Sequence, residues 1–354
     1  MFGFFKNMST KDKSFSCTEV SDFLVGSHEE KGRRPTMEDA VIYADLDSRG
    51  NLKSKSKLNR ICFFGVYDGH GGSQTSKELR TSLHVAVGEE LKKVIADYIS
   101  IDDNEKSNNI IKNCLKTSFL SIDSRVCSER HNSGSTATTA LILGDRIFAA
   151  NVGDSRVVLC RGGIAVPMSE DHKPSRPDEK ARIAKSGGFV MNGRVLGELA
   201  VSRAFGDKRF KDLEEIADML KDDDDENEMI VQPLVSPEPD FCVETLQEND
   251  EFLLLACDGL FDVMSNQQAI DFIRNELDRH GNPSQAAQAT TKHAVSVKGS
   301  SDNVSIVIVK IKDINSSIVQ QDGKNNNITT TSSSSTTDVA VAAAEENPAS
   351  SISS

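Results

Sequence analysis

The chain has 354 residues, and its 37% hydrophobic and 27% charged composition indicates a soluble globular core with some polar excess. A net charge of −13 argues against a nucleic-acid binder. No apolar run approaches the roughly 20 residues that a membrane span needs, and we expect no membrane association. The seven cysteines form no C-x-x-C pair and several lie in apolar runs, which favours reduced thiols in a cytosolic or nuclear protein.

Composition divides the chain into a lead, a globular domain and a tail. Residues 1–20 are predicted to be a flexible lead, and residues 21–312 have a globular pattern. Residues 313–354 are rich in Ser, Thr and Asn and are predicted to be a disordered tail. Within the domain, residues 212–228 hold ten acidic residues and one lysine. This acidic insert has two interpretations, a solvated surface loop or a segment that selects or blocks substrates.

Short apolar runs predict strands through much of the domain, at 61–68, 136–143, 146–152, 156–160, 241–246, 251–258 and 303–311. The breaks at Gly144-Asp145 and at Gly153-Asp154-Ser155 predict two hairpin turns. Helical periodicity predicts helices at 76–95, 109–129, 176–188, 266–277 and 283–295. Sequential strands with helices in blocks indicate an α+β domain, with antiparallel sheets inside and helices outside.

Acidic residues gather where the apolar runs stop. They are Glu38, Asp39, Asp68, Asp154, Asp258, Asp262 and Asp302. Any one of them is readily explained as a turn former or a cap. If the strand ends converge, however, the carboxylates repel one another, and a hard divalent cation is the natural counter-charge for an all-oxygen cluster.

Nine segments resemble the motifs of the protein phosphatase 2C family, the metal-dependent Ser/Thr protein phosphatases. They are RRPTMEDA (33–40), YDGHGG (67–72), GSTATTA (134–140), NVGDSRVVLCRGG (151–163), DHKP (171–174), AVSRAFGD (200–207), LVSPEPD (234–240), LACDGLFDV (255–263) and SDNVS (301–305). They run in the family's order from about 22 to 312. The resemblance implies a layered β-sandwich of two antiparallel sheets flanked by helices (α-β-β-α).

The resemblance also implies a site for two Mg²⁺ or Mn²⁺ ions. By this likeness Asp68 bridges the ions, and Asp258 and Asp302 complete one of them. Glu38 and the carbonyl of Gly69 bind the other, with Asp39 nearby through water. Asp154 and Asp262 match positions that can hold a third, weaker ion.

Two further residues match catalytic positions of the family. Arg34 matches the arginine that grips the substrate phosphate, with Arg33 as a rival for that role. His70 matches the proposed general acid, and the alternative is a turn histidine without a catalytic part. The implied reaction is hydrolysis of phosphoserine or phosphothreonine by a metal-activated bridging water, without a phosphoenzyme. We expect Arg203 and DHKP to support the fold or substrate docking.

Three classes of function follow from this resemblance. The first is an active Ser/Thr protein phosphatase that acts on phosphoprotein substrates, which we expect to be a monomer. The second is a non-catalytic family member that serves as a binding or regulatory module, which should have lost a metal carboxylate. The third is a hydrolase of small phosphoesters, for which the sequence offers no base-recognition signal.

Overall fold

The computed structural model describes residues 17–47, 58, 60–129, 131–220 and 232–311. These residues all belong to one compact unit, bounded by Met1–Asp313. The predicted tail at 313–354 lies outside the described residues, as do residues 1–16 of the lead and 221–228 of the acidic insert. Within the described ranges, no helix combines the length and apolar character that crossing a membrane requires.

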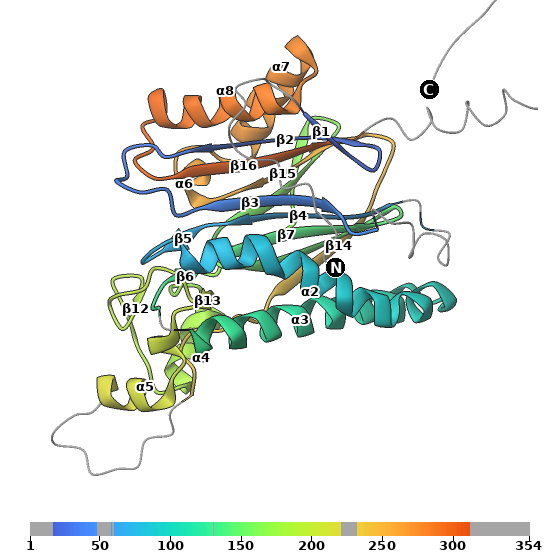
Figure 1. Ribbon diagram of the computed structural model, residues 1–354. Helices are drawn as coiled ribbons and strands as arrows, with labels where there is room; N and C mark the ends of the chain where they lie inside the picture. The colour runs from blue at the N-terminus through green and yellow to red at the C-terminus, as the bar shows by residue number, and fades with distance from the viewer. Residues whose placement is uncertain (1–16, 48–57, 59, 130, 221–231, 312–354) are drawn as a thin grey trace, which may run out of the picture. The chain divides into compact units, whose positions relative to one another are not determined.

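Two stacked antiparallel sheets form the centre of the molecule (Figure 1). The six-stranded sheet has the order β1 (Thr18–Val20), β2 (Phe23–Glu30), β16 (Val304–Lys310), β15 (Asp250–Ala256), β9 (Arg156–Arg161) and β10 (Ile164–Pro167). The five-stranded sheet has the order β14 (Asp240–Thr245), β8 (Arg146–Val152), β7 (Ala137–Leu143), β4 (Ile61–Tyr67) and β3 (Ala40–Asp45). The predicted α+β sandwich is therefore confirmed.

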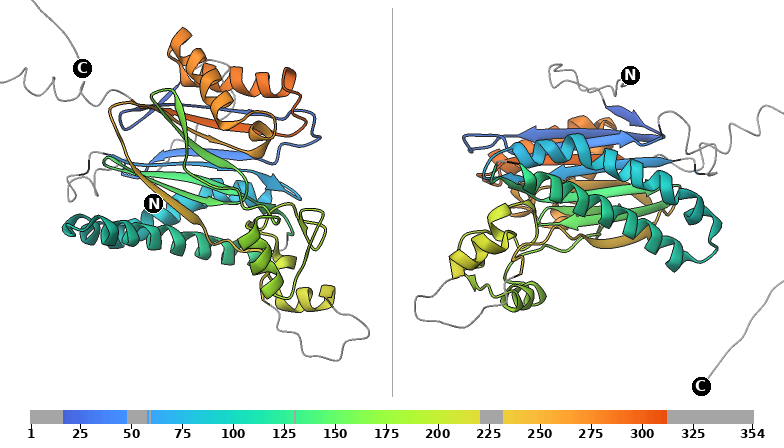
Figure 2. Two further views of the ribbon diagram at one scale, coloured as in Figure 1. Left: turned by 180° about the vertical axis from the view of Figure 1, so that it is seen from behind. Right: turned by 60° about the horizontal axis from the view of Figure 1, so that its bottom comes forward.

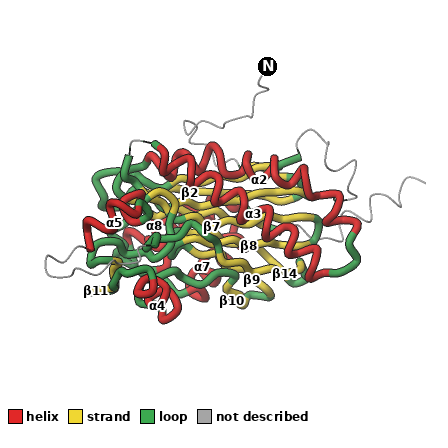
Figure 3. Tube along the Cα trace, turned by 90° about the horizontal axis from the view of Figure 1, so that it is seen from below, coloured by secondary structure: helices red, strands yellow, loops and turns green. Residues whose placement is uncertain are grey.

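Helices cover the outer face of each sheet (Figures 1 and 2). Helices α2 (Gln74–Ser100) and α3 (Asn104–Ser128) lie side by side over the five-stranded sheet, as Figure 3 shows from below. Helices α7 (Asn266–His280) and α8 (Pro283–Ser296) cover the six-stranded sheet. A capping box at Ser265 starts α7, and Gly281 ends it with a φ of 67°.

The inner strands are buried on both faces because the sheets have neighbours on both sides. In β4, Phe63 packs toward α2 and α3, and the next residue, Phe64, packs into the layer between the sheets. Leu253 and Val307 reach the same layer from the six-stranded sheet. This layering explains why the strand sequences are continuous apolar runs and lack alternation.

One of the two predicted hairpins is wrong. Gly144-Asp145 does join the paired strands β7 and β8. Gly153-Asp154-Ser155, however, carries the chain from β8 in the five-stranded sheet to β9 in the six-stranded sheet. Glycine and aspartate favour any tight change of direction, so their presence cannot distinguish a hairpin from a crossover between sheets.

Two other segments differ from the expectations. Strand β1 begins at Thr18, inside the predicted lead, because Val20 is buried in the core between the sheets. Within the acidic insert, Leu213–Leu220 forms helix α5. Its Ile216 is fully buried in a small apolar cluster with Phe210. The solvated-loop interpretation is therefore wrong for this part of the insert.

We predict that Gly26→Ala destabilises the fold by roughly 1–3 kcal/mol or more, because β2 and α8 are in close backbone contact at this point. A Cβ on Gly26 would lie 2.1 Å from the Ser284 nitrogen and 2.2 Å from the Pro283 carbonyl carbon. Gly88→Ala is the matched control, since nothing lies within 4 Å of its added Cβ inside α2. The control should gain about 1 kcal/mol of stability in urea unfolding. Equal stability of the two variants would contradict the close packing of α8.

Candidate active site

The acid-bearing strand ends of both sheets meet at one end of the sandwich. In the five-stranded sheet, Ala40 pairs with Tyr67, so Asp39 and Asp68 stand one residue beyond neighbouring strand ends. In the six-stranded sheet, Ala256 pairs with Ile306. Asp258, two residues past β15, and Asp302, two residues before β16, therefore leave that sheet at the same end.

These carboxylates are close enough to raise one another's pKa. Burial, and then the neighbouring charges of Asp39, Asp258 and Asp154, raise the pKa of Asp68 well above its usual range. Burial raises the pKa of Asp258 to about 7, helped by Asp154 and Asp262. Asp39 is 5% exposed, and burial raises its pKa to about 6. The cluster therefore contains more negative charge than its surroundings offset.

The donor set fits a hard divalent cation. Both carboxylate oxygens of Asp39 are buried without a hydrogen bond of ordinary geometry, although the side chains of Ser305, Cys257 and Asp68 lie close by. Across the described part of the chain, no three His, Cys, Asp or Glu side chains already converge on one point as a metal cage. The fit therefore rests on the chemistry of the donors, which are carboxylate oxygens whose negative charge is not offset by the protein. A bound cation would draw these oxygens together.

Glu38 is held in place by the turn that follows β4. Its carboxylate accepts hydrogen bonds from Thr36 Oγ1 at 2.9 Å and from the Gly72 nitrogen at 3.1 Å. A Cβ on Gly69 would lie 2.3 Å from the Glu38 carbonyl oxygen, so this close approach requires glycine. Asn303, which the sequence analysis did not single out, accepts a hydrogen bond from the Glu38 nitrogen at 2.9 Å.

Two cations border the acidic cluster. Arg34 Nη2 lies 2.6 Å from Asp302 Oδ2, and the Arg34 side chain is 57% exposed. Lys173, in the DHKP segment, forms an ion pair with Asp154. His172 is fully buried and fixes this segment against the crossover. Its backbone N–H donates to the Gly153 carbonyl, and its ring Nδ1 accepts from the Gly153 nitrogen. The DHKP segment was expected to support the fold or substrate docking, but the ion pair of Lys173 with Asp154 was not predicted, because it depends on how two loops pack.

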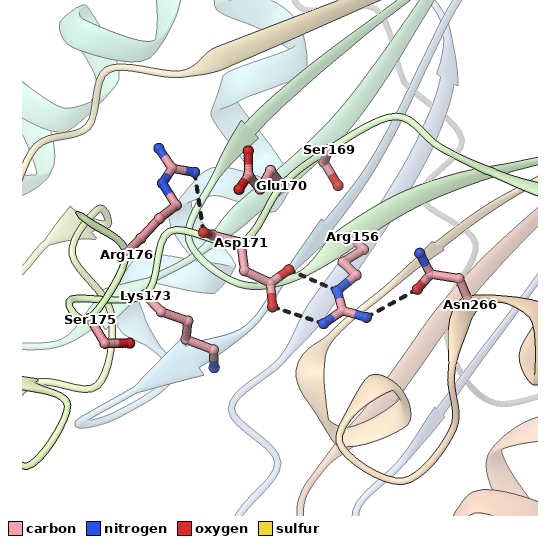
Figure 4. A pocket seen from close by; sticks show the side chains of 8 residues that line it. All are labelled: Arg156, Ser169, Glu170, Asp171, Lys173, Ser175, Arg176 and Asn266. Carbon is pink, nitrogen blue, oxygen red and sulfur yellow. Dashed lines mark hydrogen bonds and ion pairs between the residues drawn. The ribbon is translucent and has the colours of Figure 1, made fainter. Parts of the chain in front are cut away.

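A cavity of about 390 Å³ opens beside Lys173 (Figure 4). Its other basic groups are already neutralised within the protein. Arg156 binds Asp171 at 2.7 and 2.9 Å and Asn266 at 3.0 Å. Arg176 forms an ion pair with Asp178 at 2.7 Å and donates to the Asp171 carbonyl at 3.2 Å. The cavity therefore lies next to the acidic site, and its lining is polar, with basic side chains paired to acidic ones.

His70 lies at the edge of the cluster in a small three-stranded ribbon. The ribbon joins β5 (Gly69–His70), β6 (Gly134–Ser135) and β13 (Phe205–Gly206). His70 Nε2 lies 2.8 Å from Asp207 Oδ2. Burial lowers the pKa of His70, but the hydrogen bond and charge of Asp207 outweigh burial and raise it above its ordinary value. Asp207 was not predicted as a site residue, since it lies 137 positions along the chain from His70.

Arg203 has a structural environment, as expected. Its side chain is 13% exposed and binds Glu179 at 2.9 Å and Asp240 at 2.8 Å. Burial raises the pKa of Glu179, but Arg203 and Arg182 outweigh burial and hold it at about 2. Arg203 therefore cross-links the segment between β10 and β14, which we call the flap (residues 168–239).

Comparison with known proteins agrees with this architecture. Residues 23–304 match the family model described as protein phosphatase 2C. The chain is 36% identical over 325 residues to "Probable protein phosphatase 2C 75" of Arabidopsis thaliana, covering 80% of this chain and 72% of that relative. It is 37% identical over 292 residues to "Probable protein phosphatase 2C 45" of Oryza sativa subsp. japonica, covering 81% and 87%.

A solved structure supports the same fold. The crystal structure of serine-threonine phosphatase 2C from Toxoplasma gondii superimposes with a TM-score of 0.66 at 23% identity, covering 84% of this chain and 97% of that one. The relatives are named as phosphatases, which does not favour the alternative of a non-catalytic module. The chain therefore belongs to the protein phosphatase 2C family and is a protein serine/threonine phosphatase.

Proposed function

We propose that the acidic cluster holds two Mg²⁺ or Mn²⁺ ions and that this site hydrolyses phosphoserine and phosphothreonine in phosphoprotein substrates. The supporting observation is the set of buried carboxylates at converging strand ends, with raised pKa values for Asp39, Asp68 and Asp258. Family membership supports it too, since protein phosphatase 2C enzymes are metal-dependent.

The ligand assignment follows from the elements that carry each group. Asp68 is central to the cluster, because its pKa responds to Asp39, Asp258 and Asp154 at once, and we assign it to both ions. Asp258 and Asp302 would complete one ion from the six-stranded sheet. Glu38 and the Gly69 carbonyl would complete the other from the five-stranded sheet, with Asp39 acting through water. Asp154 and Asp262 would hold a third, weaker ion.

When bound, such ions supply a water nucleophile at neutral pH and positive charge toward the phosphoryl oxygens. The chain's own groups then orient the substrate and handle its leaving group. Arg34 is exposed at the rim and uses one nitrogen on Asp302, which leaves other N–H donors for a phosphate oxygen. His70, if protonated, would deliver a proton to the departing seryl or threonyl oxygen.

All seven cysteines are free thiols, which supports a reducing compartment, either cytosol or nucleus.

The direct test is hydrolysis of a phosphothreonine peptide with added Mn²⁺ or Mg²⁺, then with a chelator, and in the presence of an okadaic-type inhibitor. We expect activity that needs the metal and resists the inhibitor. Turnover that continues undiminished in the chelator would overturn the proposal.

We predict that Arg34→Ala raises KM for the peptide by about 10- to 100-fold, because a charged hydrogen bond to the phosphate is lost. Arg33→Ala is the matched control, one residue away and of the same charge. It should change KM little if Arg34 is the phosphate ligand. Steady-state kinetics at saturating Mn²⁺ would separate the two, and a larger effect at Arg33 would assign the phosphate to the rival residue.

A further inference from the structure

We propose that Asp207 is the positioning residue for His70, and that the pair presents Nδ1 of the imidazole to the leaving group. This inference rests on the proposed role of His70 as general acid. Asp207 accepts the Nε2–H, which leaves the Nδ1–H to be donated. As the bond between phosphorus and the seryl or threonyl oxygen breaks, that oxygen takes the Nδ1 proton and leaves as a hydroxyl. The water oxygen forms the new bond to phosphorus and releases one proton to solvent. Neutral His70 keeps its Nε2–H on Asp207 until solvent returns a proton to Nδ1.

The contact between the two side chains is short and sheltered. Nε2 of His70 and Oδ2 of Asp207 are 2.8 Å apart. The Asp207 side chain is 5% exposed and the His70 side chain 31% exposed, so the pair is sheltered at the carboxylate and open at the imidazole. Within the described residues, Nδ1 of His70 makes no hydrogen bond. One ring nitrogen is thus committed to the protein and the other is available to a substrate.

The backbone around the pair is built for this contact. His70 and Gly206 both pair with Gly134, and Asp207 directly follows Gly206. A Cβ on Gly134 would lie 2.2 Å from His70 Nε2 and 2.3 Å from Asp207 Oδ2. Gly134 does not have a left-handed φ, so its backbone conformation does not require glycine. Glycine is needed there because the side chains of His70 and Asp207 occupy the space that a Cβ would take.

A role in its own turn or as a helix cap does not explain why residue 207 carries a carboxylate. Asp207 has a φ of 50°, in the left-handed region that costs an L-residue about 1–2 kcal/mol. It precedes the short 3-10 helix η1 (Lys208–Phe210), yet its side chain makes no capping hydrogen bond to that helix. The carboxylate instead contacts His70, on the three-stranded ribbon that joins the flap to the turn after β4. Residues held in this backbone region often mark functional sites.

The test compares leaving groups in the Mn²⁺-loaded enzyme. p-Nitrophenyl phosphate has a good leaving group that needs no proton, and a phosphothreonine peptide has a poor one. We expect Asp207→Ala to lower kcat for the peptide by about 10- to 100-fold and to leave p-nitrophenyl phosphate nearly unchanged. Asp207→Asn, which keeps an oxygen acceptor for Nε2–H, should fall between Asp207→Ala and the wild type. In a His70→Ala background, Asp207→Ala should add nothing.

Matched variants separate this role from a structural one. Gly134→Ala should reproduce the selective loss on the peptide, because its Cβ displaces the pair. Asp212 is a flap carboxylate that accepts hydrogen bonds from the backbone nitrogens of Glu214 and Glu215, and Asp212→Ala should leave the ratio of the two substrates unchanged. Equal slowing of both substrates by Asp207→Asn, or multiplicative effects of Asp207→Ala and His70→Ala, would overturn the inference. If His70→Ala itself slowed both substrates equally, the general-acid part of the proposed function would fail instead.

Discussion

Asp258→Asn is expected to lower kcat/KM for a phosphothreonine peptide by roughly 10²–10³-fold or more at saturating Mn²⁺. Asp258 lies among Asp68, Asp154 and Asp262, where burial raises its pKa to about 7. Asparagine has nearly the same shape but no charge, so it replaces an anionic metal ligand with a weaker neutral one and leaves the packing intact. The measurement is steady-state turnover across a Mn²⁺ titration.

Stability gives this variant a second and independent readout. Without metal, removing one of several repelling carboxylates should raise the melting temperature of Asp258→Asn above that of the wild type. Asp271→Asn is the control, since Asp271 lies on α7 and its Oδ1 accepts a hydrogen bond from Gln267 Nε2 at 2.8 Å. The control should keep normal turnover. Wild-type turnover by Asp258→Asn would contradict the assignment of Asp258 as a ligand.

The second large effect is a pH-dependent loss of stability in the metal-free protein. The folded-state pKa is about 6 for Asp39 and about 7 for Asp258, above the ordinary carboxyl value of 3.8. Between about pH 4 and pH 7 the folded state therefore binds more protons than the unfolded state. The free energy of unfolding must then fall as pH rises through this window, by roughly 1.4 kcal/mol for each unit by which a folded-state pKa is raised.

Divalent cations should cancel this trend, because they replace the protons as the positive charge in the cluster. Urea unfolding at pH 5, 6, 7 and 8, in chelator and in excess Mg²⁺, measures both curves. Glu29, whose pKa burial raises to about 7, contributes a slope of the same sign that Mg²⁺ should not remove. Asp258→Asn should flatten the curve in chelator. A wild-type curve in chelator that is flat or rises with pH would refute the electrostatic description of the cluster.

Much of the fold could be predicted from the sequence because the buried elements have strong periodicity. The run at 61–67 is apolar throughout, and every residue of β4 is buried. Helical periodicity also identified the helix after Ser265 and the helix after Asn282. The crossover at Gly153-Asp154-Ser155 could not be predicted, since turn residues do not specify which strands pair. Helix α5 was hidden because its anchoring apolar residues, Ile216 and Met219, stand among acidic ones.

The candidate site shows the same division. Asp39, Asp68, Asp258 and Asp302 were predicted because each ends or begins an apolar run. The side chains that contact His70 and Asp154 were not predicted, because those contacts depend on how separate loops and ribbons pack. Asp207 reaches His70 through β13 and β6, and Lys173 reaches Asp154 through His172. Such pairs depend on the relative placement of ribbons and loops, which residue spacing does not encode.

Anomalous diffraction from crystals soaked in Mn²⁺ tests the central proposition most directly. We predict two manganese peaks on either side of the Asp68 carboxylate, one reached by Asp258 and Asp302 and the other by Glu38 and the Gly69 carbonyl. Soaked crystals with no peak in contact with Asp68, or with manganese bound only elsewhere on the surface, would contradict the account.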